Sequence, residues 1–317
     1  MDGRKLGDDR IVVALSADAA FSRPLAVALA SLARCTAGVR HEVFVLHDGY
    51  DEGLKARVGA CANENVDLVW IDTRSSVHES RVLRGPDFPP SMFDRLRLAA
   101  LLPSDVERVI YLDSDVVVRE PLVELWNADL GNTPVAAVRD PVLPWAASPR
   151  NLDWRTLGLP PDMPYFNSGV LVIPLRRWRD EDIGGRALEI LRRYPFVRAD
   201  QCALNAVAAG SWTPLHPRWN LQGGHVSPIE SHAWLADRPD DVENAREHPA
   251  VIHFNKAFWN RPWQEGSRYP NRELWFEDLD RTPWTGWRPD EPPRRIVRRA
   301  AKRVARAARV LVYGSSS

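Results

Sequence analysis

Short runs of branched apolar residues alternate with helical patterns through the first half of the chain, and this alternation constrains the fold most. The runs cover residues 11–15, 43–46, 66–71, 109–112 and 135–138. Each is short and apolar throughout, which is typical of a buried strand. Helical patterns cover 24–34, 52–62 and 94–102. The order predicts an α/β fold with right-handed crossovers and a mostly parallel, Rossmann-like sheet flanked by helices.

The second half is richer in proline and tryptophan but returns to the same pattern. It contains a further apolar run at 169–175 and helical patterns at 182–194 and 199–209. We interpret the proline-rich loops after Pro141 as a lid or an acceptor-binding wall. The proline-rich segment 289–293 (Pro-Asp-Glu-Pro-Pro) would interrupt helices and strands, so we predict one domain over residues 10–288 and a separate tail over 289–317.

Cysteine content and hydropathy exclude several classes of protein. Three cysteines, Cys35, Cys61 and Cys202, share no metal-ligand spacing, and their odd number argues against a disulfide framework. We expect core thiols in a reducing compartment. No apolar run approaches the ~20 residues that span a bilayer, and the polar start is unlike a signal peptide. We therefore expect neither secretion nor a membrane span.

The basic residues are unevenly distributed. The chain has 42 basic and 42 acidic residues, but the segment 294–309 carries eight basic residues and no acid. Apolar residues within 294–312 follow helical spacing, which predicts a basic amphipathic helix. Such a helix can bind an anionic membrane surface; the alternatives are a nucleic-acid arm or a solvated tail. The remaining chain is acidic, so we expect a membrane surface and no nucleic acid.

Acidic residues follow the predicted strands at the edge where parallel sheets bind ligands. They are Asp18, Asp48, Asp72, Asp113, Asp115 and Asp140. Asp113 and Asp115 are two residues apart, so strand alternation puts both on one face. Paired carboxylates suit Mg²⁺ or Mn²⁺ held together with substrate phosphates. The alternative is a turn with two solvated acids.

Several ordered motifs carry a resemblance to a known family. They are 111–116 (Tyr-Leu-Asp-Ser-Asp-Val), 165–171 (Tyr-Phe-Asn-Ser-Gly-Val-Leu), 200–205 (Asp-Gln-Cys-Ala-Leu-Asn), 253–255 (His-Phe-Asn) and 261–263 (Arg-Pro-Trp). Across about residues 11 to 263, the chain resembles glycosyltransferase family 8, which includes bacterial lipopolysaccharide galactosyltransferases. The resemblance implies a GT-A fold, a UDP-sugar donor, and Mn²⁺ between the aspartates and the diphosphate.

The resemblance also assigns residues to the metal and the nucleotide. It implies that Asp113, Asp115 and His253 are the metal ligands. It implies donor contacts from Ser16, Ala17, Asp18 and Ser114, with Asp18 near the uracil ring. The alternative for Asp18 is a helix N-cap. A lone histidine at a strand end is otherwise more often structural.

Five further residues match positions near the donor sugar. They are Arg95, Asp140, Asn167, Asp200 and Gln201. Arg95 would grip diphosphate or sugar hydroxyls; the alternative is a solvated helix face. Arg97 is two residues away, so only one of the two arginines should face the site. Gly169 permits close backbone approach beside Asn167.

The segment 253–263 departs from the family pattern. It is two residues longer than usual, lacks a glycine, and has Arg261 where the family has lysine. Lys256 or Arg261 would supply the positive charge for the diphosphate, and the sequence leaves both open.

The stereochemistry and mechanism of the reaction are predicted from the resemblance and from the neutral side chain of Gln201. The family implies retention of the anomeric configuration. Gln201 stands where a nucleophile would be needed, and an amide is a poor nucleophile, so we favour front-face attack through an ion pair.

These expectations describe a retaining hexosyltransferase with a UDP-galactose or UDP-glucose donor and a carbohydrate or glycolipid acceptor. We expect it in the cytoplasm, peripheral on the inner face of a bacterial membrane. The alternatives are a metal-dependent nucleotide-sugar phosphohydrolase and a non-catalytic sugar-binding scaffold.

Overall fold

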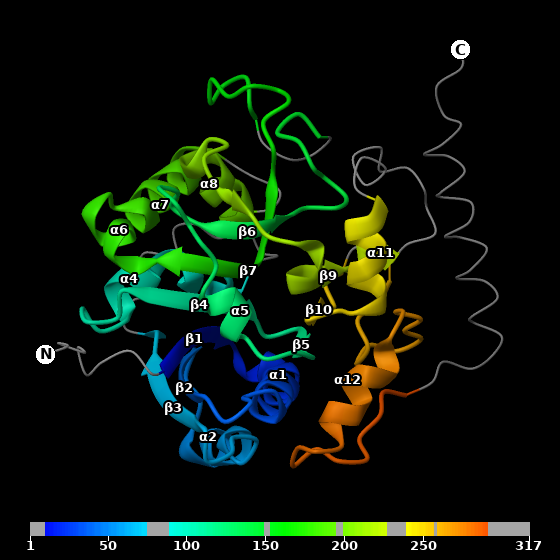
Figure 1. Cartoon of the computed structure of the whole chain (residues 1–317). Helices are drawn as coiled ribbons and strands as arrows, with labels where there is room; N and C mark the ends of the chain where they lie inside the picture. Colours follow the sequence, from blue (N-terminus) through cyan, green and yellow to red (C-terminus); the bar gives the residue numbers. More distant parts are fainter. Residues whose placement is uncertain are drawn as a thin grey trace, which may run out of the picture.

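Within the part of the chain that the structure describes, the larger of two sheets contains all six strands that the sequence predicts. The computed structural model describes residues 10–74, 89–148, 153–194, 199–226, 239–256 and 259–290 (Figure 1). The sheet order is β3 (Val66–Asp72), β2 (Arg40–His47), β1 (Arg10–Ala17), β4 (Arg108–Asp113), β7 (Phe166–Pro174), β6 (Ala136–Arg139) and β8 (Thr213–Pro214). Only β7 runs antiparallel to its neighbours within this sheet. The prediction of a mostly parallel sheet is confirmed.

Helices cover both faces of this sheet. The described helices are α1 (Ser22–Arg34), α2 (Glu52–Gly59), α4 (Leu98–Leu101), α5 (Val123–Trp126), α6 (Leu175–Asp180), α7 (Ile183–Arg193), α8 (Ala199–Ala208), α9 (Gly223–Val226), α11 (Pro239–Glu247) and α12 (Arg272–Leu279), with 3₁₀ turns η1 (Ala19–Phe21), η3 (Pro90–Arg97) and η4 (Pro217–Asn220). In β1, Val13 and Leu15 pack in the core that contains α1, whereas Val12 and Ala14 pack in the core that contains α6 and α7. Figure 1 shows α1 and α7 on opposite sides of the sheet. Because both faces are buried, these strands read as continuous apolar runs.

One predicted helix is replaced by a different conformation. The sequence predicts a helix over 94–102, but the structure has the 3₁₀ turn η3 followed by the single turn α4. Four consecutive residues, Phe93, Asp94, Arg95 and Leu96, are buried in this segment. The segment is buried from more than one side, because it contacts β1 as well as the helices α7 and α8.

A smaller sheet joins two distant parts of the chain at the end of β4. Its strands are β5 (Val116–Val118), β10 (Val251–His253) and β9 (Leu221–Gln222). β10 is antiparallel to β5, and His253 pairs with Val116. β10 is parallel to β9. This pairing brings the chain near residue 253 beside the Asp113–Asp115 segment.

The remaining expectations about the chain as a whole have mixed outcomes. Cys35, Cys61 and Cys202 are buried thiols, as predicted. The predicted basic helix at 294–312 lies outside the described residues. Among the residues that are described, no helix has both the length and the apolarity needed to cross a membrane.

Candidate active site

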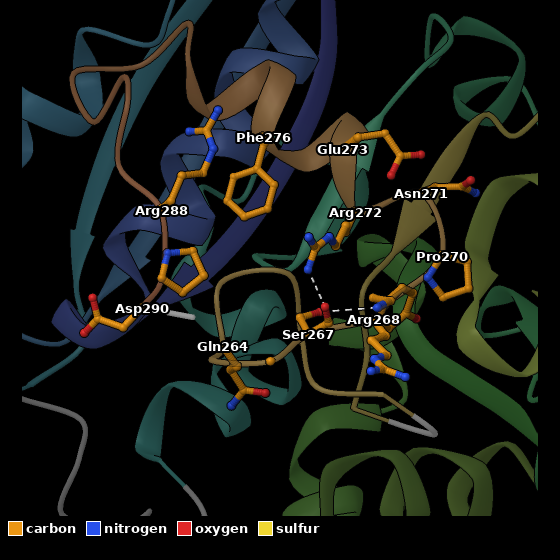
Figure 2. Close-up of a pocket in the computed structure, with 13 residues that line it drawn as sticks. Gln264, Ser267, Arg268, Pro270, Asn271, Arg272, Glu273, Phe276, Arg288 and Asp290 are labelled. Carbon is orange, nitrogen blue, oxygen red and sulfur yellow. Dashed lines mark hydrogen bonds between the residues drawn. The ribbon is translucent and has the colours of Figure 1, made fainter. Parts of the chain in front are cut away.

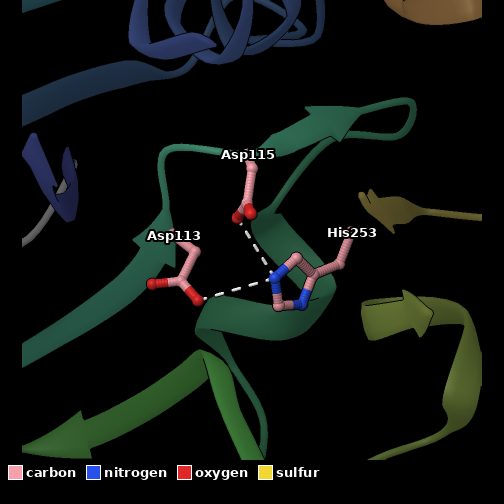
Figure 3. A group of neighbouring side chains, drawn as sticks. All are labelled: Asp113, Asp115 and His253. Carbon is pink, nitrogen blue, oxygen red and sulfur yellow. Dashed lines mark ion pairs between the residues drawn. The ribbon is translucent and has the colours of Figure 1, made fainter. Parts of the chain in front are cut away.

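Asp113, Asp115 and His253 meet where the two sheets join. Asp113 ends β4, Asp115 immediately precedes β5, and His253 ends β10. The His253 Nε2 atom lies 3.1 Å from Asp115 Oδ1 and 3.5 Å from Asp113 Oδ2 (Figure 3). One ligand atom from each residue lies within 4.8 Å of the others. Two carboxylate oxygens and one imidazole nitrogen are a ligand set that Mn²⁺ accepts.

Gly169 leaves the space in which these ligands meet. A Cβ atom at this position would lie 2.2 Å from His253 Cε1 and 2.8 Å from Asp113 Oδ2. Both distances are far below van der Waals contact, so a larger residue would displace the ligands. The close approach that the sequence predicts at Gly169 is therefore confirmed: the absent Cβ lets the side chains of His253 and Asp113 lie against the backbone of β7.

An arginine pairs with each of the two carboxylates. Arg95 Nη2 lies 2.7 Å from Asp113 Oδ1, and Arg261 Nη2 lies 3.0 Å from Asp115 Oδ2. Burial alone would raise the pKa of Asp115, but the charges of Arg261 and His253 outweigh burial and hold this pKa well below its usual range. Asp115 is therefore ionised and able to bind a cation at neutral pH.

Arg95 also connects Asp113 with Asp200. Its Nε atom lies 2.7 Å from Asp200 Oδ2, and its Nη1 atom donates to the Ser168 carbonyl at 2.7 Å. The guanidinium also lies over the Tyr111 ring, 4.7 Å from its centroid. Burial lowers the pKa of Arg95, but Asp113 and Asp200 raise it by more. Burial raises the pKa of Asp200 to about 6 although Arg95 opposes the shift.

Arg97 has a different partner. It lies 3.6 Å from Asp94 Oδ1, whereas Arg95 is buried and pairs with Asp113 and Asp200. Arg95 is therefore the one of these two arginines that contacts a candidate metal ligand.

Three buried polar side chains form a hydrogen-bonded group next to Asp200. Asn167 Nδ2 donates to Gln201 Oε1 at 3.1 Å, and Gln201 Nε2 donates to Asp140 Oδ2 at 3.1 Å. The other oxygen of Asp140 accepts from the backbone N–H groups of Val142 and Leu143. Asp140, Asn167 and Gln201, predicted from separate motifs, are thus brought into contact.

The residues predicted for nucleotide contact surround the end of β1. Ser114 Oγ donates to the Ser16 carbonyl at 2.5 Å, so this hydroxyl ties the Asp113–Asp115 turn to β1. Ala17 is buried. Asp18 is half-buried and accepts from the Phe21 N–H at 2.9 Å. Asp18 therefore caps the 3₁₀ turn η1, not the helix α1 that contains Pro24, whose N-cap is Phe21. The second oxygen of Asp18 has no part in that bond.

The structure distinguishes the two cationic candidates in the segment 253–263. Arg261 pairs with Asp115 and also lies 5.2 Å from the centre of the Phe21 ring. Lys256 is exposed, and no described residue forms an ion pair with it. Arg261, at the lysine position of the family, is the cation that the fold brings to the candidate metal ligand Asp115.

Four polar residues near the site are absent from the sequence prediction. Tyr111 and Ser168 lie within two of the family motifs, so their position next to predicted site residues could have indicated them. Asp94 is buried and accepts from Ser16 Oγ at 2.8 Å, and burial raises its pKa to about 6. Asn220 is buried and bonds to His253, and its sequence context gives no signal.

A hollow lies in the C-terminal part of the described chain, apart from the candidate site. It has a volume of about 610 Å³ and lies between the start of α12 and residues 288–290 (Figure 2). Arg268, Arg272 and Arg288 line it, and none of the predicted site residues does. Its wall is connected to the candidate metal site through Gln264, whose Oε1 accepts from the Arg261 N–H at 2.9 Å.

Comparison with known proteins decides the family. The family model described as glycosyl transferase family 8 matches residues 12–266. The chain belongs to glycosyltransferase family 8. This glycosyltransferase is 28% identical to general stress protein A of Bacillus subtilis over 224 residues, and the aligned region covers 69% of this chain and 74% of that protein. It is 25% identical to lipopolysaccharide 1,2-glucosyltransferase of Escherichia coli over 291 residues, and the aligned region covers 89% of this chain and 80% of that protein.

Solved structures support the same fold for this glycosyltransferase. The galactosyltransferase LgtC, solved with donor and acceptor sugar analogues, matches with a TM-score of 0.69 and 24% identity over 86% of this chain and 96% of that chain. The bifunctional glycosyltransferase WbbM matches with a TM-score of 0.73 and 24% identity over 89% of this chain and 51% of that chain. The predicted GT-A fold is confirmed.

Proposed function

We propose that this chain is a retaining hexosyltransferase that moves galactose or glucose from a UDP-sugar to a glycan or glycolipid acceptor with Mn²⁺. The observation that carries the proposal is the Asp113–Asp115–His253 cluster, which lies beside the buried group of Asp140, Asn167 and Gln201. Membership of a glycosyltransferase family and the activities of its relatives, a lipopolysaccharide glucosyltransferase and a galactosyltransferase, support sugar transfer.

The proposed roles follow from where the side chains lie. Asp113, Asp115 and His253 would hold the cation, which when bound neutralises charge on a leaving diphosphate. Arg261 keeps a positive charge at the same edge, where a diphosphate needs it. Arg95 fixes the orientation of Asp113 and Asp200 through two ion pairs.

Gln201 supports retention without a covalent intermediate. Double displacement needs a carboxylate nucleophile beneath the anomeric carbon. Gln201 is a neutral amide, and Asn167 and Asp140 hold both ends of that amide. We infer front-face attack, in which the departing phosphate oxygen takes the proton of the acceptor hydroxyl and Gln201 stabilises the cationic sugar.

A transfer assay tests this function against its two alternatives. Purified full-length protein is incubated with UDP-galactose or UDP-glucose, Mn²⁺ and a panel of saccharide and glycolipid acceptors. Glycosylated acceptor with retained anomeric configuration supports the proposal. Free hexose or hexose phosphate without glycosylated product would instead indicate a phosphohydrolase. UDP-sugar binding with no UDP release would indicate a sugar-binding scaffold.

We also propose that residues 294–312 hold the enzyme on the anionic inner face of a bacterial membrane. Eight basic residues lie between 294 and 309, and each cation near an anionic surface contributes about 1 kcal/mol. Deletion of 294–317 should abolish cosedimentation with anionic vesicles and leave transfer to a soluble acceptor unchanged. Neutral vesicles and high salt are the controls, because the attraction is electrostatic. Equal vesicle binding by the truncated protein would refute this role.

A further inference from the structure

Asn220 lies between the metal ligand His253 and the sugar-side residue Asn167. It ends the turn η4, directly before β9, and its side chain is fully buried. Its Oδ1 atom lies 3.0 Å from His253 Nδ1, and its Nδ2 atom donates to Asn167 Oδ1 at 3.0 Å. One amide thus contacts both halves of the candidate active site.

Backbone N–H groups fix the direction of these hydrogen bonds. The Gly169 N–H donates to Asn167 Oδ1 at 3.0 Å, and a backbone N–H can only donate. The Asn167 atom that faces Asn220 is therefore an oxygen. Asn220 must present its NH₂ group to that oxygen, and this leaves its carbonyl oxygen for His253.

A second backbone donor fixes the other end of the chain of amides. The Ser168 N–H donates to Gln201 Oε1 at 3.2 Å, and Asn167 Nδ2 donates to the same oxygen. The orientations of Gln201, Asn167 and Asn220 thus agree with one another and with two peptide groups of β7.

We propose that Asn220 is a positioning residue that holds His253 with its proton on Nδ1 and the lone pair of Nε2 directed at the cation. Oδ1 of Asn220 is an acceptor, so it favours a proton on the Nδ1 atom that faces it. Nε2 is the ring nitrogen that faces Asp113 and Asp115. The inference rests on the proposed function in one respect, namely that the Asp113–Asp115–His253 cluster binds a divalent cation.

Metal affinity distinguishes this role from a purely structural one. Partners of metal-binding histidines typically change metal affinity by about 10–100-fold when they are removed. Asn220→Leu should weaken Mn²⁺ binding to the full-length protein by that factor, measured by titration calorimetry. Asn220→Asp keeps an acceptor for the Nδ1–H group and should bind Mn²⁺ more tightly than Asn220→Leu.

Asn63→Leu is the control for loss of a structural asparagine. Asn63 is half-buried and holds backbone, since its Nδ2 atom donates to the Ala33 carbonyl at 2.7 Å and its Oδ1 atom accepts from the Asn65 N–H. This variant should lower the thermal unfolding midpoint and leave Mn²⁺ affinity unchanged. Equal Mn²⁺ affinity of Asn220→Leu and Asn63→Leu would overturn the inference. A wild-type protein that binds no Mn²⁺ would instead refute the metal site of the proposed function.

Nuclear magnetic resonance tests the proton position directly. In ¹⁵N-labelled protein loaded with Zn²⁺, which is diamagnetic, the ring signals of His253 are assigned by their loss in His253→Gln. We expect the proton on Nδ1 and the metal on Nε2. A proton on Nε2 would overturn the proposal even if Asn220→Leu weakened binding.

Discussion

Replacement of Gly169 by alanine tests the geometry of the metal site with one added carbon atom. Gly169 has an ordinary backbone conformation, so alanine introduces no backbone strain, and only the new Cβ matters. That atom would lie 2.2 Å from His253 Cε1, 2.6 Å from His253 Nδ1 and 2.8 Å from Asp113 Oδ2. The substitution therefore acts on two of the three proposed ligands.

The expected size of the effect follows from these distances. Nonbonded carbon atoms approach to about 3.5 Å, so the His253 ring or the backbone of β7 must move by about 1.3 Å. Metal–ligand distances tolerate changes of only about 0.2 Å. The ring cannot move freely because it is buried and bonded to Asn220. We expect Mn²⁺ binding to weaken by about 100-fold, which is at the upper end of the effect of removing a hydrogen-bond partner of a metal ligand. We also expect the free energy of unfolding to fall by about 1–3 kcal/mol, because the added carbon overpacks the site.

Titration calorimetry and urea unfolding of the same samples measure both quantities. Gly59→Ala is the control, because the nearest atom to its new Cβ is Leu68 Cδ1 at 3.8 Å, an ordinary contact. This control should keep Mn²⁺ affinity and gain up to about 1 kcal/mol of stability. If Gly169→Ala bound Mn²⁺ as tightly as the wild type, the ligands would not meet where the structure places them.

Three further predictions concern single side chains. Asp113→Asn or Asp115→Asn should lower the transfer rate, measured by UDP release, on the order of 10²–10³-fold. The control Asp67→Asn, in an exposed ion pair with Arg40, should leave the rate unchanged. Full activity of Asp113→Asn or Asp115→Asn would refute the proposed metal site. Gln201→Ala should lower kcat while the KM for the donor changes little, and loss of nucleotide binding in equilibrium titration would contradict the role assigned to it. Because burial raises the pKa of both Asp94 and Asp200 to about 6, the folded protein binds both protons more tightly than the unfolded chain, so stability should fall by about 1–3 kcal/mol per group as pH rises from 4 to 6; Asp94→Asn should remove its own share of this pH dependence of urea unfolding and leave the share of Asp200, and an unchanged pH dependence would contradict the prediction for Asp94.

The sequence predicts the large sheet because its strands are buried on both faces. All six predicted strands occur, with ends that differ by a few residues. The family resemblance assigns Asp140, Asn167 and Gln201 to the donor sugar, and in the structure these three residues form one hydrogen-bonded group. Strand patterns are local properties that can be read from the chain, whereas these three assignments depend on the resemblance.

What the sequence does not predict depends on contacts between distant segments. The strand β5 is three residues long, and its pairing with β10 is decided by the packing of the C-terminal half. The conformation of η3 is set by elements on both of its sides. Asn220 gives no signal because an asparagine after a tryptophan is ordinary, and its importance arises only from the two side chains that it contacts.

The charges at the site give a physical reason for the proposed metal and the donor diphosphate to bind together. The carboxylates of Asp113, Asp115 and Asp200 lie against the guanidiniums of Arg95 and Arg261, which leaves about one negative charge when His253 is neutral. A divalent cation alone would make this buried cluster positive, and a diphosphate alone would make it more negative. Buried charges are stable only when they are paired. Each ligand therefore lowers the free energy of binding of the other, and Arg261, which is less buried than Arg95, is the cation best placed to move from Asp115 to the diphosphate.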